Sequence, residues 1–335
     1  MECAPNLREP SCMKAHYKLP IAPLLLIFLA VSTFAQQARP PELLQAQALI
    51  SHGQSHAAIT IIEPLVQSDS HELDEANLGV AWNLLGSAYI DFENFDKARH
   101  CFETAIHILR AIPDEQMQYA TALDNLGAVA ASTDRFDEAK ALHSRARRVY
   151  EALGNHAGIT ISSCNLTMIN IALHDLRSAR ANLTQAFRES QLTNQLTDNN
   201  LAMLHSAKGS LALAEKDFHG AIAAFKLAID IWTRSNGPRF FMLGAVYALR
   251  GQVFEYLGDH PQAISDYRQA LSLFEETPGR NSAAYLKVQI SYAQALRNAG
   301  SRQEAARMEK EAKTALANVR TQQCSGCTIS AESFR

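Results

Sequence analysis

The stretch WNLLGSAYIDFENFDKARHCFETA, residues 82 to 105, places small and bulky residues at fixed helical intervals. Ala98, Phe102 and Ala105 follow one another at steps of four and three residues, which puts them on one face of an α-helix. A polar break at Glu93-Asn94 separates this pattern from the apolar residues before it. The stretch therefore predicts two helices joined by a short turn.

The same pattern returns along the chain every 40 to 42 residues. A small residue opens each copy, a second small residue usually follows seven positions later, and a mostly large residue stands between them. The first column contains Ala58, Ala98, Ala139, Ala179, Ala221, Ala263 and Ala305. Small residues let two helix backbones approach closely, and large residues fill the grooves beside them. A lone helical hairpin cannot bury such a face, whereas stacked hairpins bury it between neighbours.

These observations predict an all-α protein, namely a right-handed α-solenoid of about seven antiparallel helix pairs. The predicted pairs span approximately residues 41–68, 76–111, 114–153, 156–191, 198–235, 240–277 and 281–318. Residues 319–335 are expected to form a flexible tail that contains two cysteines. The last pair should close the stack, because charged residues surround Glu309, which replaces the large residue of the repeat.

Two segments carry a resemblance to a known family. WNLLGSAY (82–89) matches the W-x-x-L-G-x-x-Y signature of tetratricopeptide repeats, and ALDNLGAVAASTDRFDEAKALHSRA (122–146) matches almost as well. On these motifs, residues 41–318 resemble a tetratricopeptide repeat array. The units are longer than the usual period of about 34 residues. In this they are similar to the extended repeats of kinesin light chains and of bacterial peptide-sensing regulators.

Composition and motifs argue against several classes of protein. The chain has 335 residues, of which 47% are hydrophobic and 19% charged, and its formal net charge is −3. This near balance offers no basic surface, so we expect neither nucleic acid nor anionic lipid as a partner. The sequence contains no phosphate-binding glycine loop, no G-x-S-x-G and no close set of metal-ligating histidines. We therefore predict a non-enzymatic protein without cofactor or metal.

Residues 13–35 have the three parts of a secretory signal peptide. Lys14 and Lys18 give a cationic start, LLLIFLAV (24–31) is apolar, and small residues precede a cleavage point near Ala35. The apolar run is shorter than the ~20 residues that span a bilayer. We expect residues 1–35 to be removed, with Met13 as an alternative translation start. The mature chain would then be periplasmic or extracellular and lack a membrane span. An uncleaved N-terminal anchor is the alternative.

The resemblance implies that the first helix of each pair lines a concave face. Polar residues near the small column of these helices are Asn83, Asp124, Asn125, Asn165, Ser206, Ser210 and Gln252. An asparagine offers both a donor and an acceptor, which suits the backbone of an extended peptide. Similar asparagines hold peptides in kinesin light chains, and Asn83, Asn125 and Asn165 match those positions. The alternative is that these side chains satisfy neighbouring helices or face water.

The motif CSGC (324–327) is the remaining candidate for chemistry. A C-x-x-C pair is redox-active when a helix N-terminus on a βαβ scaffold lowers the pKa of one thiol, and no strand is predicted nearby. We expect Cys324 and Cys327 to form a disulfide or to have no role; a thiol-redox protein is the less favoured alternative. The main hypothesis is a scaffold that binds an extended peptide or partner protein in its groove. A peptide-sensing regulator whose superhelix changes on binding is the alternative.

Overall fold

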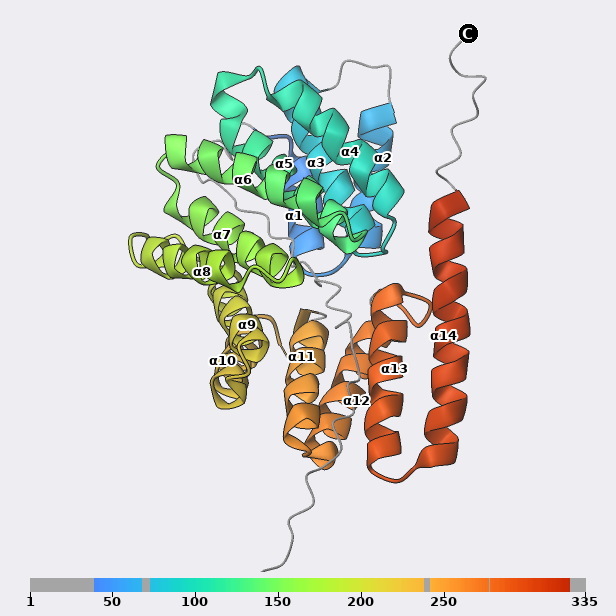
Figure 1. The fold of residues 1–335 in the computed structure, drawn as a ribbon. Coiled ribbons are helices and arrows are strands. Elements are labelled where there is room, and N and C mark those ends of the chain that lie inside the picture. Colours follow the sequence, from blue (N-terminus) through green and yellow to red (C-terminus); the bar gives the residue numbers. More distant parts are fainter. Residues whose placement is uncertain (1–38, 68–72, 238–241, 277, 326–335) are drawn as a thin grey trace, which may run out of the picture.

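The computed structural model describes residues 39–67, 73–237, 242–276 and 278–325. Within these ranges the chain forms fourteen α-helices and one short 3-10 helix, η2 (Pro113–Glu115), and contains no β-strand. The helices form seven consecutive pairs (Figure 1). The pairs are α1 (Pro41–Ser51) and α2 (Ser55–Gln67), α3 (Glu75–Ile90) and α4 (Phe95–Leu109), α5 (Gln116–Ser132) and α6 (Phe136–Ala152), α7 (His156–Ala172) and α8 (Leu176–Ser190), α9 (Asp198–Ala214) and α10 (Phe218–Asn236), α11 (Met242–Leu257) and α12 (His260–Glu276), and α13 (Ala283–Asn298) and α14 (Arg302–Ser325).

The predicted all-α solenoid is confirmed, and the largest difference from the predicted pair boundaries is at the end of the last pair. Helix α14 continues to Ser325, seven residues past the expected end at 318, so the predicted flexible tail begins as helix. The predicted signal peptide (1–35) and Cys327 lie outside the described residues. The signal peptide, its cleavage near Ala35 and the C-terminal disulfide therefore stay predictions.

The small and large columns of the repeat form the core, as the spacing predicts. All seven alanines of the first column are fully buried. Bulky residues of the second helices lie against glycines of the first helices. A Cβ added to Gly86 would lie 2.7 Å from Phe102, and one added to Gly209 would lie 2.6 Å from Phe225. In these two pairs an aromatic ring is thus seated on a helix backbone, with no room for a side chain between them.

Each turn between paired helices uses one residue in the left-handed backbone region. These residues form a further column with the same period: Gly53, Glu93, Asp134, His174, Lys216, Gly258 and Gly300, with φ between 53° and 101°. A residue in this conformation ends a helix because the backbone there turns away from the helical path. Glycine adopts it without cost, whereas other side chains are strained.

Lys216→Gly should therefore stabilise the protein by about 0.5–1 kcal/mol, because it relieves left-handed strain at an exposed turn. Urea unfolding followed by circular dichroism measures the change. Lys226→Gly is the matched control: Lys226 is exposed inside α10, where glycine should cost about 1 kcal/mol. A loss of stability in both variants would contradict the turn geometry.

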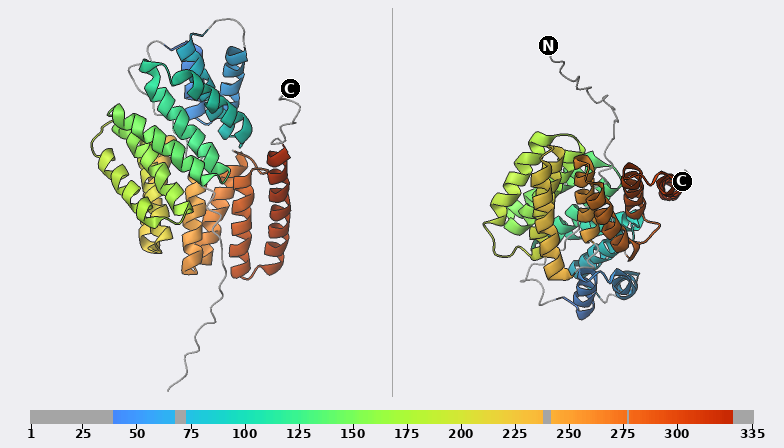
Figure 2. Two further views of the ribbon diagram at one scale, coloured as in Figure 1. Left: turned by 45° about the horizontal axis from the view of Figure 1, so that its top comes forward. Right: turned by 90° about the horizontal axis from the view of Figure 1, so that it is seen from below.

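Most neighbouring pairs stack by placing the second helix of one pair against the first helix of the next. The junction between the fourth and fifth pairs differs, because α9 packs more closely on α7 than on α8. In Figure 1 the α9–α10 pair accordingly runs steeply across the α7–α8 pair. Seen from below, the chain curves round until the last pairs lie beside the first ones (Figure 2). The solenoid turns back on itself instead of extending in a line.

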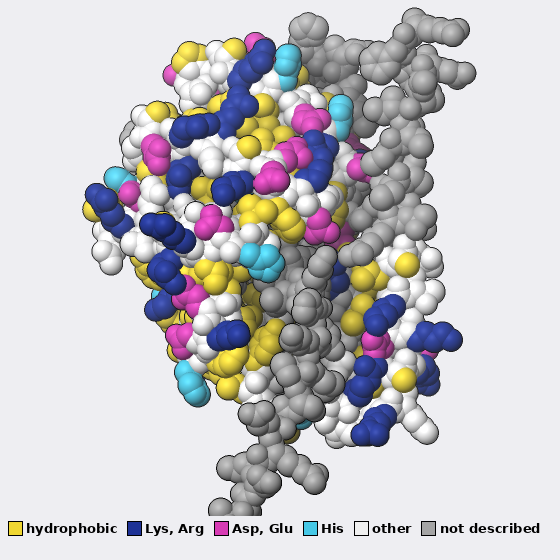
Figure 3. Space-filling view, in the orientation of Figure 1, with side chains coloured by type: hydrophobic (Ala, Val, Ile, Leu, Met, Phe, Trp, Pro, Cys, Tyr) yellow, Lys and Arg dark blue, Asp and Glu magenta, His cyan; other side chains and the backbone are white. Residues whose placement is uncertain are grey.

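The surface in Figure 3 carries Lys and Arg side chains interspersed with Asp and Glu. No large area of one sign stands out on this face, as the net charge of −3 leads one to expect. None of the helices in the described ranges is both long and apolar enough to cross a bilayer.

Candidate functional site

The first helices of the second, third and fourth pairs bury nearly all of their side chains, including polar ones. Burying an uncharged polar group without a hydrogen bond costs about 1–3 kcal/mol, so packing alone does not favour such residues. We call the following residues the polar band: Asn83 and Ser87 on α3, Asp124 and Asn125 on α5, Ser162 and Asn165 on α7, and Ser206 and Ser210 on α9. All eight are buried. The polar band contains six of the seven residues that the sequence singled out.

Two of the predicted asparagines contact each other directly. The Nδ2 of Asn125 donates to the Oδ1 of Asn83 over 3.1 Å and lies 3.3 Å from the Oγ of Ser87. Asn83 stands three residues before Gly86, whereas Asn125 stands two residues before Gly127. The two amides therefore occupy adjacent columns, and Asn125 reaches back to α3. The contact between Asn125 and Asn83 agrees with the alternative that these side chains satisfy neighbouring helices.

Asp124 is held by groups of its own chain. Its Oδ1 lies 2.8 Å from the Nδ1 of His143, and its Oδ2 accepts a 2.6 Å hydrogen bond from Ser162. Burial raises the pKa of Asp124, and these two partners offset part of the rise. His143 fills the place against Gly127 that an aromatic ring takes in other pairs. This geometry gives Asp124 a role inside the core.

Other polar groups in the same helices have no partner within the described residues. The Nδ2 of Asn83, the Oγ of Ser163 and the Oδ1 of Asn170 are buried and make no hydrogen bond. The side chain of Asn165 is 6% exposed and likewise lacks a partner among the described residues. Each such group costs free energy unless something satisfies it. The Nδ2 of Asn83 and the whole amide of Asn165 are thus the groups of the polar band's asparagines that lack a partner among the described residues.

The remaining predicted residues lie beyond the turned α7–α9 junction. The Oγ of Ser210 donates to the backbone oxygen of Ser206 over 3.0 Å, whereas the Ser206 hydroxyl has no partner within the described residues. Gln252 on α11 is partly exposed. The structure does not bring these three residues into contact with Asn83 or Asn125. Sequence reasoning missed Ser87 and Ser162, which were detectable only as small polar residues inside apolar first helices.

Asp91, directly after α3, should make stability depend on pH. Ser55 donates a hydrogen bond to it, and burial raises its pKa from the ordinary 3.8 to about 6. Because the folded state holds this proton more tightly than the unfolded state, its contribution to stability is lost as pH rises from 3.8 to about 6. Asp91→Asn should thus stabilise the protein by about 1–2 kcal/mol at pH 7 and leave it nearly unchanged at pH 4.

Urea midpoints at pH 4, 5, 6 and 7 test this expectation. Asp137→Asn, at an exposed position of α6, is the control and should show no such trend. An Asp91→Asn gain of the same size at all four pH values would contradict the proton linkage.

Cys101 on α4 and Cys164 on α7 are placed for packing. Cys101 and Cys164 are buried and unpaired, and burial raises the pKa of the Cys101 thiol to about 12 and that of Cys164 further. Such thiols are mostly protonated at neutral pH and therefore poor nucleophiles. Within the described residues, no group of three His, Cys, Asp or Glu side chains is arranged to hold a metal ion.

Comparison with known proteins agrees with this architecture. The model of the tetratricopeptide repeat family matches residues 77–152, 118–188 and 242–317, more than half of the chain. A search of curated protein sequences finds no match.

Several solved structures have a similar fold. The crystal structure of NprR in complex with its cognate peptide NprX superposes with a TM-score of 0.63 at 10% identity, covering 86% of this chain and 82% of that one. The apo form of RapI gives 0.57 at 14% identity, with 83% and 98% covered. A Rap protein complexed with Competence and Sporulation Factor gives 0.56 at 12% identity, with 85% and 93% covered. At these identities the likeness shows the fold alone.

Proposed function

The chain belongs to the tetratricopeptide repeat family, and from this premise we propose that it is a non-enzymatic scaffold for protein–protein interaction. Its ligand would be an extended peptide, or an extended segment of a partner protein, held along the polar band. The protein would act outside the cytoplasm once residues 1–35 are removed. The unpaired Nδ2 of Asn83 and the unpaired amide of Asn165 carry this proposal.

An amide suits this task because it pairs with either half of a peptide unit. Asn165 has both its donor and its acceptor available, whereas the buried Nδ2 of Asn83 would donate to a ligand carbonyl once the side chains that cover it move aside. Neighbouring first helices are also linked through Asn125, which fixes the orientation of Asn83. In the free protein these buried polar groups raise the free energy because they lack a hydrogen-bond partner. A ligand that supplies the partner removes this penalty, which adds to the free energy of the new hydrogen bond.

Two of the structural relatives were solved with a bound partner: NprR with its cognate peptide and the Rap protein with Competence and Sporulation Factor. The peptide bound to NprR supports a peptide as the ligand class for this chain. The second candidate function is a regulator whose superhelix changes shape on binding. It is favoured by the hydrogen bonds from Ala283 and Ala284 of the seventh pair to Glu93 of the second pair.

Selection of a random-sequence peptide display library against the intact chain tests the proposal. Asn165→Ala and Asn83→Ala should each weaken binding of a selected peptide about tenfold or more, as expected for loss of an amide contact worth ~1.5 kcal/mol. Asn165→Ala should leave the melting temperature unchanged or slightly raised, since this side chain has no internal partner to lose.

Asn199→Ala is the matched control, because Asn199 lies at a partly exposed position of α9 and pairs only with Asn236 among the described residues. It should bind the selected peptide as tightly as the unaltered protein. Equal affinity in all three variants would reject the polar band as the binding surface. A library that yields no binder would count against a peptide ligand.

A further inference from the structure

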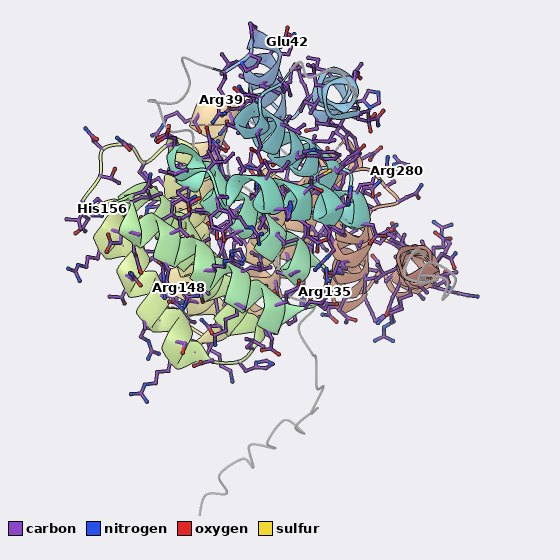
Figure 4. The ribbon with its side chains drawn as sticks, turned by 90° about the horizontal axis from the view of Figure 1, so that it is seen from above. Arg39, Glu42, Arg135, Arg148, His156 and Arg280 are labelled. Atoms are coloured by element: carbon purple, nitrogen blue, oxygen red, sulfur yellow. The ribbon has the colours of Figure 1, made fainter. Side chains whose placement is uncertain are left out.

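A carboxylate from the second pair caps a helix of the seventh pair. Glu93 lies in the turn between α3 and α4, and its two oxygens accept hydrogen bonds from the backbone N–H groups of Ala283 (2.6 Å) and Ala284 (3.1 Å). These residues open α13 and are separated from Glu93 by 190 and 191 positions. Figure 4 shows Arg280, just before α13, beside the helices of the first pairs. The contact joins two distant parts of the curved solenoid.

The start of a helix is a favourable place for a carboxylate such as that of Glu93. The first N–H groups of a helix have no partner inside the helix and carry a partial positive charge, which attracts an anion. Ser282 accepts from the N–H of Tyr285, so the side chains of Ser282 and Glu93 together satisfy three of these groups. The positive charge of Lys287 also favours the ionised carboxylate. Burial opposes it and raises the pKa of Glu93.

Within the described helices, no substantial helix-on-helix packing joins the second and seventh pairs. Helix α13 packs on α12 and α14 and makes minor contact with α11, whereas α3 packs on α4, α2, α1 and α5. In a solenoid, stability is approximately a sum of contacts between neighbouring units. Release of the Glu93 contact would therefore leave every stacked interface in place, and only the curvature of the whole array would be free to change.

Glu93 also differs from the other members of its turn column. It adopts a left-handed backbone conformation with φ of 53°, which three units fill with glycine. Asp134, His174 and Lys216 share this conformation, but their side chains make no hydrogen bond within the described residues. Of the non-glycine members, Glu93 is thus the one whose strain is accompanied by a long-range contact.

We propose that Glu93 is a latch that holds the seventh pair against the second, and that release of the latch opens the curved solenoid to a partner. The identity of what enters rests on the proposed function. The latch itself needs no ligand and can be tested without one. It would supply the change of shape that a peptide-sensing regulator requires, because a ligand that prefers one curvature shifts the equilibrium between latched and open forms.

Glu93→Gly in the intact chain is the decisive variant, since glycine suits the left-handed turn and removes the carboxylate. Asp134→Gly makes the same change at the equivalent turn of the next pair. In Glu93→Gly, hydrogen exchange at the amides of Ala283 and Ala284 should become at least tenfold faster, and the radius of gyration from small-angle scattering should increase. Asp134→Gly should change neither. Unaltered exchange and an unaltered radius in Glu93→Gly would overturn the proposal.

Association rates of a selected peptide test whether the Glu93 latch controls the entry of a ligand into the solenoid. Glu93→Gly should bind it faster than Asp134→Gly does, and equal rates combined with faster exchange would overturn the gating role. Glu93→Gln, which keeps one acceptor oxygen but loses the charge, should lie between the two in exchange rate. If no peptide can be selected, that result counts against the proposed function alone, because exchange and scattering still decide whether the latch exists.

Discussion

Phe225→Ala should lower the free energy of unfolding by about 3–5 kcal/mol, the largest loss that we expect from one apolar side chain. The ring is fully buried and sits directly on the backbone of Gly209 in the paired helix. Its removal leaves a cavity that neither α9 nor α10 can fill, because the glycine provides no side chain to move inward. The packing between α9 and α10 of the fifth pair should be weakened most.

Urea unfolding gives the total effect, and hydrogen exchange along α9 and α10 shows where it falls. Leu227→Ala is the control: Leu227 is 43% exposed and stands two residues away on the same helix. It should cost less than about 0.5 kcal/mol. A Phe225→Ala loss below about 1 kcal/mol would mean that the pair can collapse around the missing ring, contrary to close packing on Gly209.

The repeat was predictable because the same physical constraint applies seven times. Every pair must bury a face against its neighbour, so Ala98 and its equivalents recur at one spacing and are all fully buried. The turn column was equally present in the sequence, but Glu93, Asp134, His174 and Lys216 share no side-chain chemistry. Only the backbone angle unites them, and a pattern of side chains does not reveal it.

The long-range geometry could not be predicted in this way. The interval between Ala179 and Ala221 is the same as in the following units, yet α9 turns onto α7 at that junction. The contact between Glu93 and Ala283 depends on the summed rotation of five junctions, and a small change in each would separate the two residues. The spacing of residues in the sequence determines how neighbouring pairs pack. Contacts between distant pairs depend on the sum of the angles at all the junctions that separate those pairs.

The candidate site was predicted in composition but not in arrangement. Asn83, Asn125 and Asn165 were correctly placed on the first helices, which the family resemblance implies. Asn83 and Asn125 differ by one residue in their distance from the glycine of their helix. One residue rotates a helical side chain by about 100°, and this decides whether two such amides face a ligand or each other. Asn125 therefore pairs with Asn83, whereas Asn165 is left without a partner among the described residues.

Asp124→Ala should lower the free energy of unfolding by about 2–4 kcal/mol, although the sequence placed this residue in the binding groove. The variant leaves the ring of His143 and the hydroxyl of Ser162 buried without their acceptor, and it opens a small cavity as well. Urea unfolding measures the loss. Ser144→Ala, on the partly exposed face of α6, should change stability by less than about 0.5 kcal/mol.

A second substitution separates a core role from a binding role for Asp124. His143→Phe combined with Asp124→Ala should recover about half of the loss, because Phe102 and Phe225 occupy the equivalent place against a glycine in their own pairs. Recovery stays incomplete since Ser162 still lacks its acceptor. If Asp124 instead served a partner, the single variant would keep its stability and lose peptide binding. That combination of results would contradict the core assignment and return Asp124 to the binding surface.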